Sequence, residues 1–304
     1  MDVAIIGGTG FVGSYLVDAL NAAGHQLSLL VRPGSESRLS NSERCRIVPG
    51  DLGSPASINA TLRDCDATIY NVGILREFPS KGITYEAMQY ESVVRVAESA
   101  KALGVSRFVL MSANGVRPDG TRYQQTKYRA EQAVLSCGLD VTIFRPSVIF
   151  GDPRGRDEFA SQLYRQMISP PLPAIGFRSG IGADNTVKMS PVHVEDVAAA
   201  FVTALGNPST FGETFELGGP EILSWEQILE RIAAATGRNK WTIPMPIGLM
   251  KLPAALLDWL PYFPVTLDQL RMLEEGNTAD SGPLQALIER EPRVFDAQNL
   301  AYLK

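Results

Sequence analysis

Cysteine and histidine are both scarce in this chain of 304 residues, which excludes several classes of protein. The cysteines lie far apart, form no CxxC pair and number three: Cys45, Cys65 and Cys137. This distribution argues against a disulfide framework or a zinc site and fits a reducing compartment. Because His25 and His193 are the only histidines, we expect no histidine-based metal site.

The chain also lacks a basic run. Its 28 lysines and arginines are outnumbered by 33 acidic residues, which gives a formal net charge of −5. Proteins that bind nucleic acid cluster cations against the phosphate backbone, so we do not expect nucleic acid as a partner. "DVAII" at residues 2–6 already reads as a buried strand. No targeting segment is therefore expected, and the predicted location is the cytoplasm.

Residues 242–265 form the most hydrophobic stretch, long enough to span a bilayer. Prolines interrupt it at positions 244, 246, 253, 261 and 264. Each break frees backbone groups that lipid cannot satisfy, so we expect no transmembrane segment. Three roles stay open: the wall of an apolar substrate pocket, a peripheral contact with a membrane or a protein partner, and burial against the cofactor domain.

The first thirty residues read as a strand, a glycine-rich turn, a helix and a second strand. In the turn "GGTGFVG", Gly7 permits a tight bend, Gly10 lets the backbone approach a pyrophosphate and Gly13 lets the helix press on the strand. The pyrophosphate would lie at the helix N-terminus, where free N–H groups and the helix dipole favour an anion. The motif predicts a dinucleotide site that also includes Thr9, Phe11 and Val12.

The end of the second strand indicates which dinucleotide binds. An NAD site usually has a carboxylate there for the ribose hydroxyls, whereas this chain has Arg32, followed by Ser35 and Arg38. A guanidinium can hold a 2′-phosphate through paired N–H donors. The pattern therefore favours NADP(H), with NAD(H) as the alternative.

Strand and helix patterns alternate through the first 150 residues, which predicts a Rossmann-type, doubly wound parallel α/β sheet of about seven strands. A long helix is expected over residues 83–103, and a last helix after Ser224, with Gln227 completing a capping box. We predict a dinucleotide-binding domain over residues 1–150, joined by 188–218, and a smaller substrate-facing lobe over 151–304, which begins with irregular loops and one amphipathic helix.

Ligands of such a sheet bind at the carboxyl ends of its strands. The residues that follow the predicted strands, and that we expect at the dinucleotide, are Asp51, Leu52, Asn71, Val72, Gly73, Pro146, Ser147 and Val148. Basic residues in the later loops would suit an anionic substrate, but the pattern favours solvated surface for them; they are Arg154, Arg156, Arg165, Arg178 and Lys188.

Tyr123 and Lys127 stand four residues apart in "RYQQTKYRAEQAV", so on a helix their side chains leave the same face. Ser112 ends the fifth predicted strand and would face the same rim. Such a trio suits hydride chemistry on a carbonyl or alcohol: Tyr123 as acid and base, Lys127 to lower the tyrosine pKa and hold the ribose, and Ser112 to orient the substrate oxygen. The alternative is that Tyr123 and Lys127 only form part of the polar face of an ordinary amphipathic helix.

Taken with "GGTGFVG", "GDL", "MSA", "RPSVIFG" and "SPVHVEDVAAAF", the "YQQTK" motif resembles the atypical, extended-type short-chain dehydrogenase/reductases of the epimerase/dehydratase kind. The resemblance covers nearly the whole chain. "RPSVIFGDPRGRDEF" and "TIPMP…LPYFPVTLDQLRML" are most similar to the branch of the NADPH-binding accessory subunit of respiratory complex I and its bacterial relatives. The resemblance assigns Ser112, Tyr123 and Lys127 to the catalytic positions. Residues 89–92, "QYES", depart from the N-x-x-G found in the family.

Two functions follow as hypotheses, and a sugar-nucleotide substrate is a third possibility, which would need a pyrophosphate site in the loops of residues 151–190. The first is an NADP(H)-dependent oxidoreductase or epimerase acting on a small substrate, apolar or quinone-like. The second is a non-catalytic NADPH-binding accessory or assembly factor for a respiratory or quinone-handling complex, which the branch resemblance implies.

Overall fold

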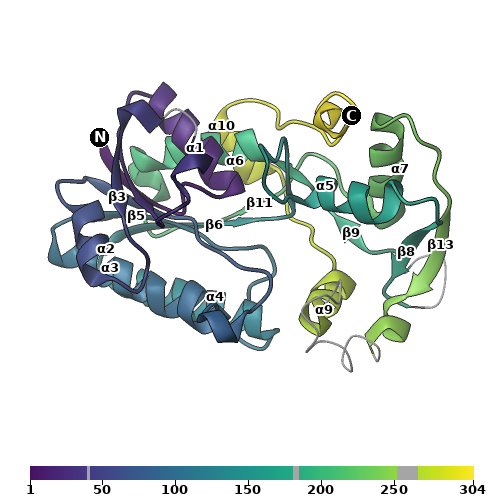
Figure 1. The fold of residues 1–304 in the computed structure, drawn as a ribbon, viewed down its shortest axis with the longest axis horizontal. Coiled ribbons are helices and arrows are strands. Elements are labelled where there is room, and N and C mark those ends of the chain that lie inside the picture. The colour runs from purple at the N-terminus through teal and green to yellow at the C-terminus, as the bar shows by residue number, and fades with distance from the viewer. Residues whose placement is uncertain (40–41, 181–184, 252–265) are drawn as a thin grey trace.

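The computed structural model describes residues 1–39, 42–180, 185–251 and 266–304. Seven parallel strands form the main sheet in the order β11-β6-β5-β4-β1-β2-β3 (Figure 1). Their bounds are β1 (Asp2–Ile6), β2 (Gln26–Val31), β3 (Cys45–Pro49), β4 (Ala67–Tyr70), β5 (Arg107–Met111), β6 (Asp140–Pro146) and β11 (Thr214–Leu217). The predicted Rossmann-type sheet is confirmed, and the strand expected within 188–218 is its seventh.

The strand order reverses at β1, which pairs with β2 on one side and with β4 on the other. Because the connections leave β1 and β4 in opposite directions, their carboxyl ends open into a crevice, the usual ligand site of such sheets. Gly7 follows β1, and Asn71 follows β4. The backbone N–H of Asn71 donates to the Ile6 carbonyl at 2.9 Å.

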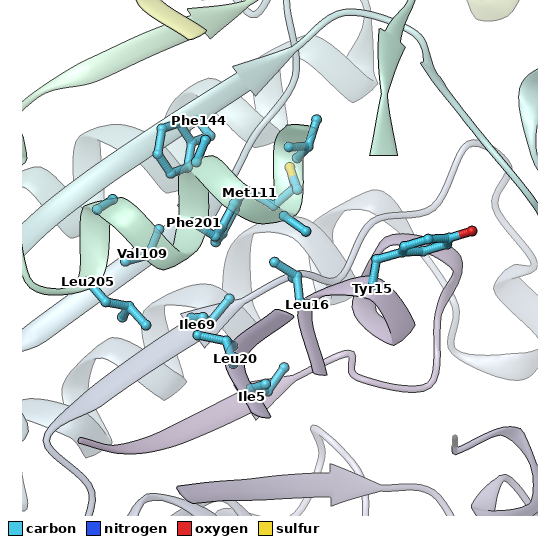
Figure 2. Packing of buried hydrophobic residues seen from close by; sticks show 14 of the residues in the cluster. Ile5, Tyr15, Leu16, Leu20, Ile69, Val109, Met111, Phe144, Phe201 and Leu205 are labelled. Carbon is cyan, nitrogen blue, oxygen red and sulfur yellow. The ribbon is translucent and has the colours of Figure 1, made fainter. Parts of the chain in front are cut away.

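One face of the sheet is covered by α1 (Phe11–Ala22), α6 (Val194–Leu205) and α10 (Gly282–Ile288). Figure 2 shows the apolar layer between this face and the helices, where Ile5 and Ile69 of the sheet meet Leu20 of α1. Side chains of this size each stabilise the fold by roughly 1.5–3 kcal/mol when fully buried. The layer therefore fixes α1, and with it the glycine-rich turn.

The opposite face packs against α2 (Pro55–Leu62), α3 (Ser92–Ala102) and α4 (Arg122–Leu135) (Figure 1). The start of α4 is fixed by a capping box, in which Thr121 and Gln124 satisfy each other's backbone N–H groups. The helix expected over 83–103 begins instead with a π-helical segment, Glu86–Glu91, which passes into α3. The apolar periodicity of this stretch did not reveal the wider turn, because a π-turn inserts one residue without breaking the helix.

The later residues build a lobe with a core of its own, centred on Phe150, Phe177, Trp225, Ile228 and Phe295. Its helices are α5 (Phe159–Leu163), continued by a π-helical segment (Tyr164–Ile168), α7 (Trp225–Ala235) and α9 (Leu267–Glu275). Its strands form the pairs β8 (Ala174–Arg178) with β13 (Thr242–Pro246), β7 (Ile149–Phe150) with β10 (Val192–His193), and β9 (Lys188–Met189) with β12 (Leu223–Ser224).

Two expectations for this lobe are wrong. The helix opened by Ser224 has the predicted capping box with Gln227, but α9 and α10 follow it. The loops after Gly151 also contain strand β8, because its pairing partner is supplied by residues more than sixty positions later. Short 3₁₀ turns complete the chain: Glu36–Arg38, Ser42–Arg44, Pro79–Lys81, Pro208–Thr210 and Ala301–Leu303.

The hydrophobic stretch 242–265 is only partly described. Residues 242–246 form β13, and beside it Trp241 is 81% exposed, whereas residues 252–265 lie outside the described chain. Within the parts of the chain that the structure describes, no helix has both the length and the apolarity to cross a membrane.

Candidate dinucleotide and catalytic site

The glycine-rich turn brings its own backbone into close contact with two other backbone segments, the residues after β4 and the start of α1. Gly7 has a φ of +99°, and a Cβ atom there would lie 2.4 Å from the Asn71 carbonyl oxygen. A Cβ atom on Gly13 would lie 2.1 Å from the Gly7 carbonyl oxygen. Both positions therefore require glycine, one for the bend at the β1–β4 crevice and the other for the close approach of α1.

The start of α1 fits a pyrophosphate. Gly10 is its N-cap, and no side chain caps the helix, so the N–H groups of the first turn, at Phe11 and Val12, are left for another acceptor. A Cβ atom on Gly10 would meet only the Gly7 carbonyl oxygen, at 3.4 Å, so the other side of this glycine is open. An uncapped helix N-terminus beside an open backbone surface is the arrangement that binds phosphate.

The other expected contacts lie at the carboxyl edge of the same sheet. Arg32 directly follows β2 and is exposed. The Asp51 carboxylate accepts the Gly53 N–H at 2.7 Å, and the Leu52 carbonyl accepts from Arg95 at 2.5 Å. Past β6, the Ser147 hydroxyl donates to the Ser190 carbonyl. The remaining positions follow β4 or border Ser147: Asn71, Val72, Gly73, Pro146 and Val148.

Tyr123 and Lys127 occupy the first half of α4, facing the site. Lys127 is 6% exposed, and its ammonium donates to the carbonyl of Met111, the last residue of β5, at 3.2 Å. The same nitrogen would lie 3.8 Å from a Cβ atom on Gly73, so this glycine borders it without a clash. It also lies 5.8 Å from the centre of the Tyr123 ring. The Lys127 ammonium and the Tyr123 ring therefore lie on the same face of α4.

Burial shifts the pKa values of this pair in opposite directions. Removal from water lowers the pKa of Lys127 to about 8, and the nearby Glu131 carboxylate partly opposes the shift. Burial raises the pKa of Tyr123 well above its usual value of 10, and Tyr85 adds to the shift. The sequence led us to expect a lowered tyrosine pKa; in the chain alone it is raised, chiefly because Tyr123 is removed from water.

Ser112 belongs to a buried polar network. Its hydroxyl donates to the carboxylate of Glu131, a residue that is 1% exposed and lies one turn after Lys127 on α4. Arg145 of β6 donates to the same carboxylate through Nε at 2.9 Å and Nη2 at 2.5 Å. The proton of the Ser112 hydroxyl is thus committed to Glu131, and its oxygen lone pairs remain as acceptors.

The rim of the site combines apolar side chains with contacts from the lobe. Leu75 and Phe78, which follow β4, are exposed, and the Tyr85 hydroxyl donates to the Leu75 carbonyl at 3.0 Å. From α9, Gln269 donates to that same carbonyl at 3.3 Å. Figure 1 shows the starting end of α4 close to α9. The segment following β4 and helix α9 therefore meet at the Leu75 carbonyl, next to Tyr85, whose ring contacts that of Tyr123.

The sequence did not single out several residues that shape this site. Glu131 was not among the predicted site residues, although its position four residues after Lys127 places it on the same helix face. Gln89 was noted as a departure from the family; it is buried, donates to the Ile74 carbonyl at 2.8 Å and accepts from Thr126 at 3.1 Å. Arg145 carried no local signal, because its partner lies on another element.

The described residues contain no cluster of histidine, cysteine, aspartate and glutamate side chains able to hold a metal ion. The fold places a glycine-rich turn at the strand-order reversal, with an uncapped helix start beside it. This combination defines the class of NAD(P)-binding Rossmann proteins.

Comparison with known proteins narrows the class. A family model described as NAD(P)H-binding matches residues 7–168, more than half of the chain. The chain belongs to this NAD(P)H-binding family, among the epimerase/dehydratase-like short-chain dehydrogenase/reductases.

The similar proteins are named for different functions: a respiratory-complex subunit, a reductase and an epimerase. A subunit of NADH dehydrogenase [ubiquinone] from Arabidopsis thaliana (alpha subcomplex subunit 9, mitochondrial) is 29% identical and covers 92% of this chain and 70% of its own. Ceramide reductase from Caulobacter vibrioides is 28% identical, over 84% of this chain and 77% of its own. A nucleoside-diphosphate-sugar epimerase from Staphylococcus aureus shares the fold, with a TM-score of 0.77 at 16% identity, over 99% of this chain and 100% of its own.

Proposed function

We propose that this protein is an NADPH-dependent oxidoreductase that reduces a carbonyl group of an apolar substrate. The observation that carries the proposal is the buried ammonium of Lys127, beside Gly73 and one helical turn from Tyr123. A lysine removed from water is costly unless a partner or a function retains it. Here a single backbone carbonyl accepts from the ammonium among the described residues, which leaves donors for a ribose and for the tyrosine.

The proposed roles follow from this geometry. When bound, the nicotinamide supplies the hydride. Tyr123 donates a proton to the carbonyl oxygen of the substrate as that oxygen gains charge, and Lys127 favours the resulting phenolate. While its proton is donated to Glu131, Ser112 can only accept, so it would take a hydrogen bond from the hydroxyl of the alcohol product and not donate one to the substrate carbonyl. The buried surroundings of Tyr123 keep it protonated until substrate and cofactor enter.

The choice of NADPH over NADH rests on the end of β2. Arg32 is exposed there, and within the described residues no carboxylate lies within 4.0 Å of it. A guanidinium at this position favours a ribose 2′-phosphate, whereas an NAD site uses a carboxylate.

The choice of an apolar substrate rests on the rim and on one relative. Leu75 and Phe78 expose apolar surface after β4, Leu75 accepts from the hydroxyl of Tyr85, whose ring contacts that of Tyr123, and a relative covering most of this chain is named ceramide reductase. Apolar walls with a few converging polar groups are typical of small-molecule sites.

The test is NADPH oxidation, followed by absorbance, with a short-chain ubiquinone analogue and a long-chain ketone as substrates. Tyr123→Phe should lower the turnover number by about 10²–10⁴-fold, the usual contribution of a general acid, while the Kd for NADPH changes less than about threefold. Tyr128→Phe, five residues later on the same helix and half-buried, is the matched control and should retain activity. Equal activity in Tyr123→Phe and wild type would refute the catalytic role.

The second candidate function is a non-catalytic NADPH-binding subunit of a respiratory complex. It is favoured by the relative that is named as a subunit of NADH dehydrogenase and by the departure at Gln89 from the family's asparagine. Tight NADPH binding without turnover on carbonyl substrates, or on a UDP-sugar in the presence of NAD, would favour this function over the first.

A further inference from the structure

Arg156 lies far from the glycine-rich turn in the sequence but contacts it in the fold. Its Nε donates to the Thr9 carbonyl at 2.9 Å, across 147 positions of the chain. Its Nη2 donates to the carbonyl of Arg38, which belongs to the segment after β2. One side chain from the segment after β7 therefore touches both the turn after β1 and the segment after β2.

The segment that carries Arg156 is held in place independently. Arg154 pairs with Asp18 of α1 at 2.5 Å, and its guanidinium stacks 3.7 Å from the centre of the Tyr15 ring. The Tyr15 hydroxyl donates to the Asp152 carbonyl at 3.0 Å. Arg156 itself donates to the Arg154 carbonyl at 3.0 Å. The segment is thus attached to α1, and the position of Arg156 does not depend on its own contacts alone.

The positive charge of Arg156 is not neutralised by these contacts. Its three acceptors are backbone carbonyls, and in the described chain neither Arg156, Arg38 nor Arg32 has a carboxylate within 4.0 Å. Burial lowers the pKa of Arg156, and the nearby cations Arg154 and Arg38 lower it further; Tyr15 and Asp18 act in the opposite sense. Arg154 is neutralised by Asp18. Arg156 and Arg38 therefore bring two cations close together beside the glycine-rich turn, and within the described residues neither has a carboxylate partner.

This end of the crevice is where the adenosine ribose of a dinucleotide lies in such folds, between the turn after β1 and the end of β2. We propose that Arg156 contributes to recognition of the ribose 2′-phosphate of NADPH, so that the lobe supplies part of the cofactor selectivity together with Arg32 and Arg38. The inference rests on the proposed NADPH-binding function and adds a residue outside the predicted cofactor domain. It also replaces our expectation that Arg156 is solvated surface.

The proposed contact between Arg156 and the 2′-phosphate would link the lobe to the bound cofactor. Two residues after Arg156, the buried Glu158 caps the start of α5 by accepting the backbone N–H groups of Ala160 and Ser161. A phosphate held by Arg156 would therefore tie the first helix of the lobe to the glycine-rich turn.

The experiment measures equilibrium binding of four probes by calorimetry: NADPH, NADH, adenosine 2′,5′-bisphosphate and 5′-AMP. In Arg156→Ala we expect the Kd for NADPH and for the bisphosphate to rise by about 10–100-fold, as for the loss of a hydrogen bond to a charged group. The Kd for NADH and for 5′-AMP should change less than about threefold. Arg165→Ala, which removes an exposed charge paired with Asp157 in the same lobe, is the matched control and should leave all four constants unchanged.

A second variant guards against loss of folding. Arg156→Gln can still donate to the Thr9 carbonyl but carries no charge, so it should lose affinity for the two 2′-phosphate probes as Arg156→Ala does. Equal weakening of NADPH and NADH, or no weakening, would overturn the inference. If Arg32→Ala abolishes the preference for NADPH while both Arg156 variants retain it, the inference fails and the proposed function stands. If the wild type binds neither nucleotide, both fail.

Discussion

Removal of the Glu131 carboxylate should destabilise the whole fold, because this group accepts hydrogen bonds from Arg145 of β6 and from Ser112, the residue that follows β5. Glu131 is 1% exposed and accepts from Ser112 and, twice, from Arg145. In Glu131→Ala the guanidinium of Arg145 and the hydroxyl of Ser112 would both lose their partner. Breaking a buried ion pair from one side costs about 3–5 kcal/mol. The Arg145 side chain is 21% exposed and can recover some hydration, so we expect about 3 kcal/mol.

Glu131→Gln removes the negative charge of the side chain but keeps its size and shape. The amide keeps one acceptor oxygen and the volume of the side chain, so the loss should be smaller, about 1–2 kcal/mol. The same change removes the carboxylate that raises the pKa of Lys127, and that pKa should fall below its value of about 8.

The assay is urea denaturation at pH 7.5, followed by circular dichroism. The midpoint should fall in the order wild type, Glu131→Gln, Glu131→Ala. Glu98→Ala, an exposed position on α3, is the matched control and should stay within about 0.5 kcal/mol of wild type. A loss below about 1 kcal/mol in Glu131→Ala would show that the network carries little of the stability and would refute the reasoning.

Three further predictions concern other parts of the fold. Gly13→Ala places a methyl group 2.1 Å from the Gly7 carbonyl oxygen; we expect a loss of about 1–3 kcal/mol and of dinucleotide binding, measured by thermal melting and by titration. Burial lowers the pKa of Lys127 in the native state to about 8. Between pH 8 and 10.5 the unfolded chain therefore binds more protons at this lysine than the native state does, and the free energy of unfolding rises with pH. Relative to Lys127→Met, the wild type should gain about 2 kcal/mol of stability between pH 7.5 and 9.5. Asp196 is fully buried and pairs with Arg290 and Arg293; Asp196→Ala should lose about 3–5 kcal/mol and expose the C-terminal segment to limited proteolysis.

Each of these has a contrary result. Unchanged NADPH affinity in Gly13→Ala would mean that α1 can shift away from the turn. A flat pH profile in the wild type would show that Lys127 is hydrated in the native state. Proteolysis of Asp196→Ala at the wild-type rate would mean that other contacts hold the C-terminal segment.

The main sheet was predictable because its signals are local. Each strand is an apolar run, each helix has a period of 3.6 residues, and the alternation of the two leaves a parallel, doubly wound sheet as the natural arrangement. The glycine spacing adds a steric requirement that is also local: Gly7 and Gly13 meet within one turn. The family motif around Tyr123 and Lys127 spans a single helical turn, so their shared face could be read directly.

The lobe was less predictable, since its strands are short and their partners distant. Strand β8 pairs with β13, which belongs to the stretch for which the sequence left three roles open: a pocket wall, a contact surface or burial against the cofactor domain. The π-helical segment before α3 was also missed, because it leaves the helical periodicity almost unchanged.

By itself, then, the sequence determined the class of the protein: the parallel sheet, the nucleotide-binding turn and the helix that carries Tyr123 and Lys127. Only the tertiary structure determines the pKa values and the hydrogen-bond partners of these groups. Burial separates the pKa values of Tyr123 and Lys127, Glu131 engages the proton of Ser112, and Arg156 reaches the turn from the lobe. The physical reason is that desolvation and charge pairing depend on which distant segments share one space, and residue spacing along the chain does not contain that information.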